Sequence, residues 1–421
     1  MTEDRLTAGG PGPLAEKAVE RQRERLLHIL AAATFLIFFQ AYMVAPLIPR
    51  FSAVFSASEQ TVGLIVPAYL IPYGVSTLFY GILSDRLGRR RIMLGSLVAF
   101  VVLTALTATA QSVQQMLTWR LLTGLGASGV VPLALALMGQ LFPYERRGRP
   151  LGWLFGAMAG GAAFGSVFGA LLEPLLGWRG VFVGVSTLGV AIVGLLWPYA
   201  HLLGGATPGT TASIADVLGG YRALLGPWRG RLTYAYVLVN AIFHSGVFTW
   251  LGLYFARRYG LGEAGIGLAI LGYGIPGLLL GPAIGRAADR WGRRWLVPLG
   301  LGISAVAAGV LILDLPLRVA TVAVATLSLG YDMTQPLLAG IVTRLGGLRG
   351  GQAMGLNVFM LFVGFGIGSF LFGEALRLGF GVALTLFSSA QLIAAVAGIL
   401  AFRMEVPTVA HARPMKSVEQ R

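Results

Sequence analysis

The sequence predicts an all-α polytopic membrane protein with twelve transmembrane helices arranged as two pseudo-symmetric six-helix bundles. Three observations support this prediction: long apolar runs, arginines gathered in alternate loops, and an internal repeat. Of the 421 residues, 56% are hydrophobic and 12% are charged, and the mean hydropathy is +0.76. A soluble protein of this length would carry far more polar surface, so lipid is the expected solvent for most of the chain.

The apolar runs are long enough to cross a bilayer, because about 20 helical residues span a hydrocarbon core of roughly 30 Å. The chain also contains 60 glycines, and small residues let membrane helices approach one another closely. The predicted spans centre near Leu36, Tyr73, Val102, Val130, Gly161, Ala191, Phe243, Leu271, Ala305, Leu329, Phe365 and Ile393.

Basic residues gather on one side of the predicted bundle. Of the 32 arginines and lysines, 25 lie in the two terminal segments and alternate loops, six lie in the other loops, and Arg120 lies within a span. By the positive-inside rule, both termini are expected in the cytoplasm and the chain in the inner or plasma membrane. The net charge of +15 therefore indicates orientation and contact with anionic lipid rather than a nucleic-acid partner.

Five segments are expected along the chain. Residues 1–26 form a cytoplasmic N-terminal segment, and 27–200 form the first six-helix bundle. Residues 201–231 form a cytoplasmic central loop, 232–402 the second bundle, and 403–421 a cytoplasmic tail. No small-residue cleavage site follows the first apolar run, so the first span is expected to be retained.

The two bundles are expected to be copies of one unit. The stretch GILSDRLGRRRIM, which begins at Gly81, returns as GRAADRWGRRWLV from Gly285, an offset of 204 residues. Matches at this offset extend from Phe51 to Pro132 in the first half. Because each unit holds an even number of spans, both face the same way across the membrane and an axis along the membrane normal relates them.

The repeated hairpin resembles the G-x-L-x-D-R-x-G-R-[RK] loop of the major facilitator superfamily, and the resemblance covers about residues 27–402. It implies the major facilitator fold, with substrate bound between the halves at mid-depth. We interpret the hairpins as a gating latch, because their arginines can pair with acids or lipid phosphates; a basic loop that only sets topology is the alternative. The latch residues are Gly81, Asp85, Arg86, Gly88, Arg89 and Arg90, with their repeats Gly285, Asp289, Arg290, Gly292, Arg293 and Arg294.

Two further motifs extend the resemblance, and the stretches PYERRGR and GWRGVF resemble those of the twelve-helix drug–proton antiporters. Arg120 in RLLTGLG resembles the superfamily's R-x-x-x-G-x-G pattern. It is expected to face protein or water and to serve in proton coupling or substrate binding, and snorkelling to the membrane interface is the alternative. A glycine motif of the exporter branch favours efflux, although Ser166 replaces its proline and a helix-packing seam would give the same spacing. The motif glycines are Gly152, Gly161, Gly165 and Gly169.

Asp332 is an acid deep inside a predicted span, in LSLGYDMTQPLL. An ionised carboxylate there must be hydrated, paired or neutralised, so we expect Asp332 to couple protons or bind substrate. A structural hydrogen bond, or solvation near the cytoplasm, is the alternative. His244, which matches Gln40 at the 204-residue offset, can titrate between pH 5 and 8 or simply pack. Additional polar and aromatic contacts are expected from Tyr42, Asn240, Trp250, Tyr331 and Gln335.

The expected function is secondary active transport by alternating access, with proton-coupled efflux of small lipophilic molecules or drugs. Proton-coupled or facilitated uptake of a small nutrient such as a sugar or organic acid is the alternative, and a non-transporting membrane sensor is a further one. The expected partners are a small-molecule substrate, protons and membrane lipids, with the chain as a monomer. Enzymatic activity, cofactors and metals are not expected, because cysteine is absent, the four histidines are scattered, and neither Lys17 nor Lys416 belongs to a phosphate-binding loop.

Overall fold

In the ranges that the computed structural model describes, residues 13–142, 148–204 and 214–405, all the regular elements are helices, joined by short turns. Helices are the expected elements of such a sequence, because a bilayer offers no water to bond the backbone and a helix satisfies its own N–H and C=O groups. The predicted all-α fold class is therefore confirmed.

The first half of the chain forms an N-terminal bundle. Its elements are α1 (Pro13–Tyr42), η1 (Ala45–Leu47), α2 (Ile48–Phe55), α3 (Glu59–Gly63), α4 (Pro67–Leu87), α5 (Arg89–Ala108), α6 (Val113–Ala127), α7 (Val130–Leu141), α8 (Gly148–Leu196) and η3 (Trp197–Leu203).

The second half forms a C-terminal bundle, and a short helix α9 (Ile214–Leu225) precedes it. Its elements are α10 (Trp228–Thr249), α11 (Leu251–Tyr259), α12 (Glu263–Ile270), α13 (Ile275–Trp291), α14 (Arg293–Val310), α15 (Leu317–Gly346), η4 (Gly347–Arg349), α16 (Gly350–Ala375), η5 (Leu376–Leu378) and α17 (Phe380–Ala401).

These helices account for the twelve predicted spans. Eight helical stretches in the described ranges are long and apolar enough to cross a membrane, and the longest turns at Gly177 (φ 66°) and so supplies two passes. The remaining passes are α14, α15 and the pair α12–α13. Two of these differ from the eight stretches for a clear reason. Helix α15 is less apolar because it carries the polar run GYDMTQP, and the α12–α13 pass is made of two shorter helices because it is broken near Leu271.

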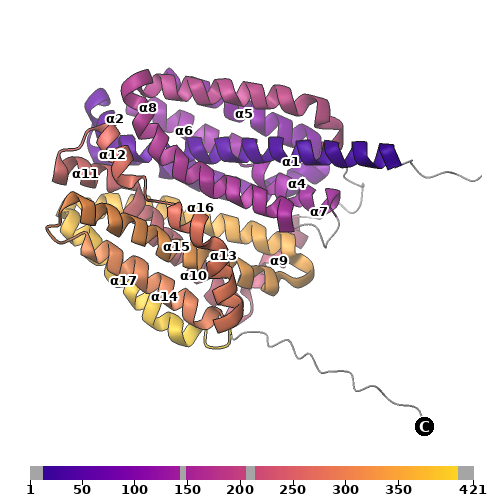
Figure 1. Cartoon of the computed structure of the whole chain (residues 1–421). Helices are drawn as coiled ribbons and strands as arrows, with labels where there is room; N and C mark the ends of the chain where they lie inside the picture. The colour runs from indigo at the N-terminus through magenta and orange to yellow at the C-terminus, as the bar shows by residue number, and fades with distance from the viewer. Residues whose placement is uncertain (1–12, 143–147, 205–213, 406–421) are drawn as a thin grey trace, which may run out of the picture.

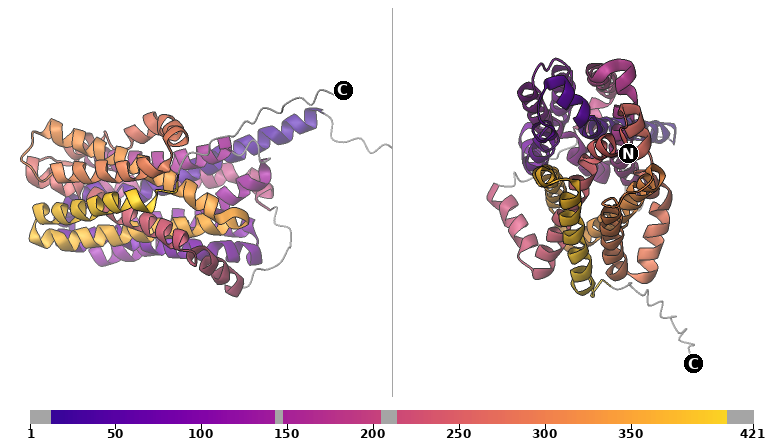
Figure 2. Two further views of the ribbon diagram at one scale, coloured as in Figure 1. Left: turned by 90° about the horizontal axis from the view of Figure 1, so that it is seen from below. Right: turned by 90° about the vertical axis from the view of Figure 1, so that its left-hand side faces the viewer.

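The two bundles lie side by side as two groups of helices (Figures 1 and 2). The chain enters α1 and leaves α17 at the same end of the molecule, which we call the terminal end; the other end carries α2, α11 and α12 (Figure 1). Helix α4 packs along α16, and α8 packs on α12. Each interface joins the second span of one half, α3–α4 or α12–α13, to the fifth span of the other half, as parallel halves require.

The end that carries α2, α11 and α12 is called the closed end, because the two halves are in direct contact there. A Cβ on Gly63 would lie 2.3 Å from the ring of Trp250 in the other half, so this close contact requires glycine. Arg257 also forms an ion pair with Glu59 across the two halves. Further contacts between the halves join Gly252 to Pro46, Gly267 to Leu171 and Gly366 to Ile71.

The same helix faces separate toward the terminal end. On α4, a Cβ at Gly74 would lie 2.9 Å from Phe362 of α16, whereas a Cβ at Gly81, seven residues along the same face, would meet nothing within 4 Å. On α8, Ala163 contacts the other half, whereas Gly156 has open space. The halves are therefore joined from mid-depth to the closed end and apart at the terminal end.

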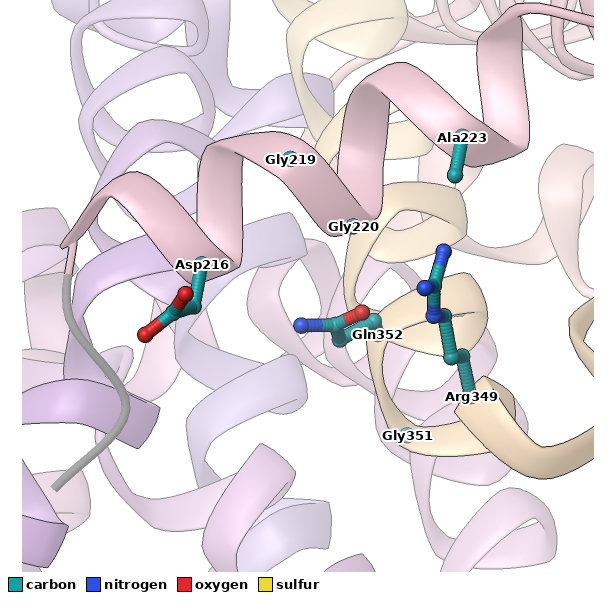
Figure 3. Close-up of a pocket in the computed structure, with 7 residues that line it drawn as sticks. All are labelled: Asp216, Gly219, Gly220, Ala223, Arg349, Gly351 and Gln352. Atoms are coloured by element: carbon teal, nitrogen blue, oxygen red, sulfur yellow. The ribbon is translucent and has the colours of Figure 1, made fainter. Parts of the chain in front are cut away.

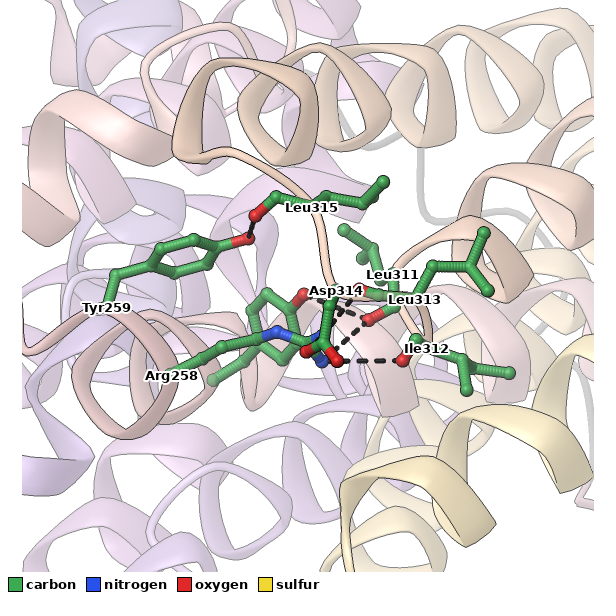
Figure 4. Close-up of polar contacts among 8 residues, drawn as sticks. Arg258, Tyr259, Leu311, Ile312, Leu313, Asp314 and Leu315 are labelled. Carbon is green, nitrogen blue, oxygen red and sulfur yellow. Dashed lines mark hydrogen bonds and ion pairs between the residues drawn. The ribbon is translucent and has the colours of Figure 1, made fainter.

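The closed end of the C-terminal bundle is braced by Arg258. Its guanidinium donates to the Leu313 carbonyl and to the Asp314 carboxylate, each at 2.5 Å, in the loop between α14 and α15 (Figure 4). The neighbouring Tyr259 hydroxyl donates to the Leu315 carbonyl at 2.9 Å. Arg258 therefore fixes the loop between α14 and α15, whereas its neighbour Arg257 joins the halves.

Helix α9 lies inside the region expected to be a loop, residues 201–231, and packs on α10 and α16. Its sequence, IADVLGGYRALL, places apolar residues at helical spacing, but two adjacent glycines weaken the helical pattern. The pattern was therefore too weak to predict this helix from the sequence alone.

Candidate transport site

An aromatic layer joins the halves at mid-depth. Tyr73 of the first half stacks on Phe362 of the second, with ring centroids 4.4 Å apart, and Tyr42 lies 6.3 Å from Phe365. Such pairs add packing energy beyond the area they bury. The layer comprises Phe38, Tyr42, Tyr73, Phe248, Phe362 and Phe365.

His244 of α10 lies beside this layer and is nearly fully buried. The hydroxyl of Tyr273 lies 2.5 Å from its Nε2 atom, and the ring of Tyr331 stacks on the imidazole at 3.6 Å between centroids. This geometry fits a packed histidine with one hydrogen-bond partner, which was one of the two interpretations of His244. The proton-coupling interpretation stays a prediction.

Asp332 of α15 lies against the break between α12 and α13. The Ser328 hydroxyl donates to its Oδ2 atom at 3.0 Å, and the carboxylate lies against the Gly277 backbone, where an added Cβ would stand 2.6 Å from Cγ. Gly277 belongs to the first turn of α13, where backbone N–H groups have no partner within their own helix. The side chain is partly exposed. Asp332 thus caps a neighbouring helix and remains accessible.

Arg120 is fully buried, which excludes the snorkelling alternative. Its Nε donates to the Ile65 carbonyl at 3.1 Å, and its Nη2 donates to the Ala41 carbonyl at 3.0 Å. Its Nη1 donates to the carbonyl and the side-chain oxygen of Gln40. The guanidinium also lies 4.4 Å from the ring centre of Tyr69, within the range of a cation–π contact.

The acceptors of Arg120 are carbonyls freed at two helix breaks. Gln40 and Ala41 precede the end of α1, and Ile65 lies between α3 and α4. The last carbonyls of a helix lack intrahelical donors and carry partial negative charge. Arg120 therefore stabilises these two breaks, and all its bonds stay within the first half.

The remaining predicted site residues divide between packing and the aromatic layer. Asn240 donates to Thr334 at 2.9 Å and accepts from Gln391, so it joins three helices of the second half. Trp250 donates to the Ser369 carbonyl at 2.9 Å as part of the closed end. The side-chain oxygen of Gln335 is buried without a partner among the described residues.

Sequence reasoning missed Tyr273 and Ser328, which connect the predicted residues to the helix break. Tyr273 matches Tyr69 at the repeat offset, just as His244 matches Gln40. Each half therefore places a tyrosine beside an equivalent position of its first long helix. This correspondence was available in the sequence, whereas nothing in the sequence identified Ser328.

The glycine motif of α8 forms a packing seam with α1. A Cβ on Gly161 or Gly165 would lie 2.4 Å from a carbonyl oxygen of α1, and a Cβ on Gly169 would lie 2.5 Å from the carbonyl oxygen of Met43, the residue after α1. Close approach of the two helices explains these three glycines. Gly152 has nothing within 4 Å. Helix packing therefore explains Gly161, Gly165 and Gly169, and the motif gives no independent support for efflux.

The latch hairpins turn where the sequence predicts. Gly88 and Gly292 have φ of 91° and 81°, a conformation that glycine adopts without strain. Arg89 donates to Gln140 at 2.5 Å, while Arg290 and the remaining charged residues Arg86 and Arg90 are exposed. Arg293 and Arg294 are partly buried. The side chains of Asp85 and Asp289 lie outside the described residues, so their role stays a prediction.

A separate groove of about 740 Å³ lies at the terminal end between α9 and the start of α16 (Figure 3). Asp216 and Arg349 stand at its two sides, and Gln352 lies between them (Figure 3). The remaining lining residues are Gly219, Gly220, Ala223 and Gly351. Gly351 and Gln352 precede Phe362 of the aromatic layer by about three turns on the same helix, so the groove lies beyond that layer toward the terminal end.

Two similar six-helix halves that meet at one end, separate at the other and hold an acid near their interface define a membrane transporter. The chain matches the Major Facilitator Superfamily model over residues 30–368 and 233–420. It belongs to this superfamily.

Relatives within the superfamily carry different names. The chain is 26% identical over 265 residues to the chloramphenicol resistance protein of Pseudomonas aeruginosa. This match covers 62% of this chain and 61% of that protein. The chain is 27% identical over 188 residues to a probable L-galactonate transporter of Escherichia coli (strain K12), and that match covers 42% and 41%. The match spans less than two thirds of the length of these relatives.

Among solved structures, the chain is similar to a bacterial homologue of the human lysosomal transporter Spinster in an inward-facing and occupied conformation. The TM-score is 0.72 at 16% identity, and the match covers 94% of this chain and 98% of that one. At this identity the similarity concerns the fold alone.

The role of Arg120 predicts a large loss of stability on its removal. In Arg120→Met the side-chain volume is similar, but four buried acceptors lose their donor. Each unsatisfied group costs about 1–3 kcal/mol, so we expect a loss of about 3 kcal/mol or more, seen as a lower midpoint of thermal unfolding in detergent. Arg257→Met, which removes an exposed ion pair, is the control and should cost about 1 kcal/mol or less. Equal losses in the two variants would contradict this role.

Proposed function

We propose that the chain is a proton-coupled exporter of small lipophilic molecules that are uncharged or cationic. The observation that carries this proposal is the placement of Asp332, a partly exposed acid next to the interface between the halves. An acid at such depth in the membrane has a high free-energy cost, and such acids commonly belong to ion or substrate pathways. The two halves would rock about the aromatic layer and expose Asp332 to each side in turn.

The charges at mid-depth support this substrate class. Between the charged ends of the spans, the sequence contains two charged side chains, Arg120 and Asp332. Arg120 is fully buried and its bonds go to helix breaks, so it is not available to an anionic substrate. Asp332 can attract a cation, and the neighbouring aromatic rings can contact one through their faces.

The distribution of basic residues supports a cytoplasmic terminal end, because 25 of 32 arginines and lysines belong to its segments. With this orientation in the inner membrane, the structure is open toward the cytoplasm and closed toward the outside. The latch hairpins would then engage when the cytoplasmic side closes. A monomer surrounded by lipid, without a cofactor, suffices for such a cycle.

Uptake of a hydroxylated nutrient is the second candidate. The buried side-chain oxygens of Gln335 and Asn357 lack partners among the described residues and can accept hydrogen bonds from a polyol. One relative is named a probable L-galactonate transporter. In a host without its own pumps, an exporter lowers the accumulation of a lipophilic dye, whereas an importer raises the uptake of the nutrient.

Proton coupling predicts solute flux driven by a pH gradient alone. In proteoliposomes, an imposed gradient should drive a fluorescent lipophilic cation against its own gradient. Asp332→Asn should reduce this flux to that of empty liposomes, because the amide can neither exchange a proton nor attract the cation. Asp314→Asn, at an exposed loop acid, should retain the driven flux. Gradient-driven flux in Asp332→Asn would contradict the proposal.

The proposed charge preference predicts discrimination between ions of matched shape. Tetraphenylphosphonium and tetraphenylborate have nearly the same size and opposite charge. We expect the purified protein at pH 8 to bind the cation at least about tenfold more tightly, because one unit charge at contact distance contributes about 1–4 kcal/mol. Equilibrium binding with radiolabelled ions measures the ratio. Tighter binding of the borate would exclude the proposed substrate class.

A further inference from the structure

The break between α12 and α13 is held by a serine from another helix. The chain turns at residues 271–274, and Gly274 adopts φ 83° as the residue before α13. Its backbone N–H donates to the Ser328 hydroxyl at 2.9 Å. An unpaired N–H in the bilayer would be costly, so the serine stabilises this turn.

The same hydroxyl connects the turn to Asp332. Ser328 accepts from Gly274 and donates its single proton to Oδ2 of Asp332 at 3.0 Å. The carboxylate in turn lies against Gly277, where a Cβ would stand 2.6 Å from its Cγ. Negative charge at the first turn of the 17-residue helix α13 interacts favourably with the helix dipole. The ionised form of Asp332 therefore holds the start of α13 in place.

The other side of this turn contacts the opposite half. A Cβ on Gly274 would lie 2.6 Å from Cβ of Ala163 in α8, and α12 continues along α8 toward the closed end. The position of the turn thus sets how closely the halves approach. A continuous set of contacts runs from Asp332 through Ser328 and Gly274 to Ala163.

We propose that Ser328 is a positioning residue that couples the charge state of Asp332 to the contact between the halves at Gly274. This inference rests on the proposed function, in which Asp332 exchanges protons. Neutralising Asp332, by a proton or by a bound cation, removes the charge that holds the start of α13. The turn then relaxes, the contact with Ala163 weakens, and the closed end opens. The empty, ionised carrier stays shut, as exchange transport requires.

Few other titratable groups face Asp332. Tyr331 is next to Asp332 on the same helix and stacks on His244 of α10, which contacts Tyr273 of the break. The sequence contains no charged residue in 232–256, 264–285 or 295–313, and none in 350–373. The packed helices therefore bring no second charge to this depth, and Asp332 is the group whose ionisation changes the local field.

The proposal is tested by a distance across the closed end, measured between nitroxides on cysteines placed at Ala53 and Ala264. Both positions are exposed, and the chain has no native cysteine, so the pair can be added to the natural sequence. In wild-type protein in lipid nanodiscs, we expect the distance to lengthen as pH falls from 8 to 5. Tetraphenylphosphonium at pH 8 should lengthen it in the same way, and tetraphenylborate should not.

Two variants separate the relay from general effects. Ser328→Ala should move the pH midpoint of the distance change upward by about one unit, because the carboxylate loses a hydrogen bond to its charged form. Ser328→Thr keeps the hydroxyl and should retain the wild-type midpoint. Asp332→Asn should give the low-pH distance at every pH.

Three results would overturn the relay. They are an unchanged midpoint in Ser328→Ala, the high-pH wild-type distance in Asp332→Asn at pH 8, and absence of a pH response in the wild type. These outcomes differ from failure of the proposed function, which is an absence of gradient-driven flux while the closed-end distance still responds to pH. Readouts of distance and flux on the same protein therefore distinguish the two.

Discussion

The structure depends on satisfying the backbone groups that are freed where helices break inside the bilayer. Lipid offers these groups no hydrogen bonds, so protein side chains must supply them. At the end of α1 and between α3 and α4, Arg120 donates to the freed carbonyls. At the break before α13, Ser328 accepts from the N–H group of Gly274, and the carboxylate of Asp332 lies against the first turn of α13. The breaks let the helices bend, and these side chains offset the free-energy cost of the unpaired backbone groups.

The two halves satisfy equivalent demands with opposite chemistry. In the first half, Gln40 and Tyr69 surround Arg120, whose charge is permanent under physiological conditions. In the second half, the equivalent positions are His244 and Tyr273, and Val324 replaces the arginine. There the break depends instead on an acid that can change its charge. The first half thus stabilises its breaks with a permanent charge, and we propose that the break of the second half responds to protons.

The sequence predicts the parts of this structure that follow from local pattern and repetition. Apolar length predicts the spans, and the 204-residue offset predicts two similar halves that face the same way across the membrane. Gly88 and Gly292 turn as predicted because a tight hairpin requires glycine there. The partners of Arg120, the bridging role of Ser328 and the contact of Gly63 with Trp250 depend on segments far apart in the chain. No periodicity in a single sequence encodes them.

Two distances measured on the same sample show whether the interface opens to each side of the membrane in turn. One nitroxide pair at Ala53 and Ala264 reports on the closed end, and a second pair at Gln22 and Thr343, also exposed, reports on the terminal end. Across a titration with transported substrate in lipid, the account predicts that one distance lengthens as the other shortens. Distances that lengthen together, or that both stay fixed while substrate is transported, would contradict it.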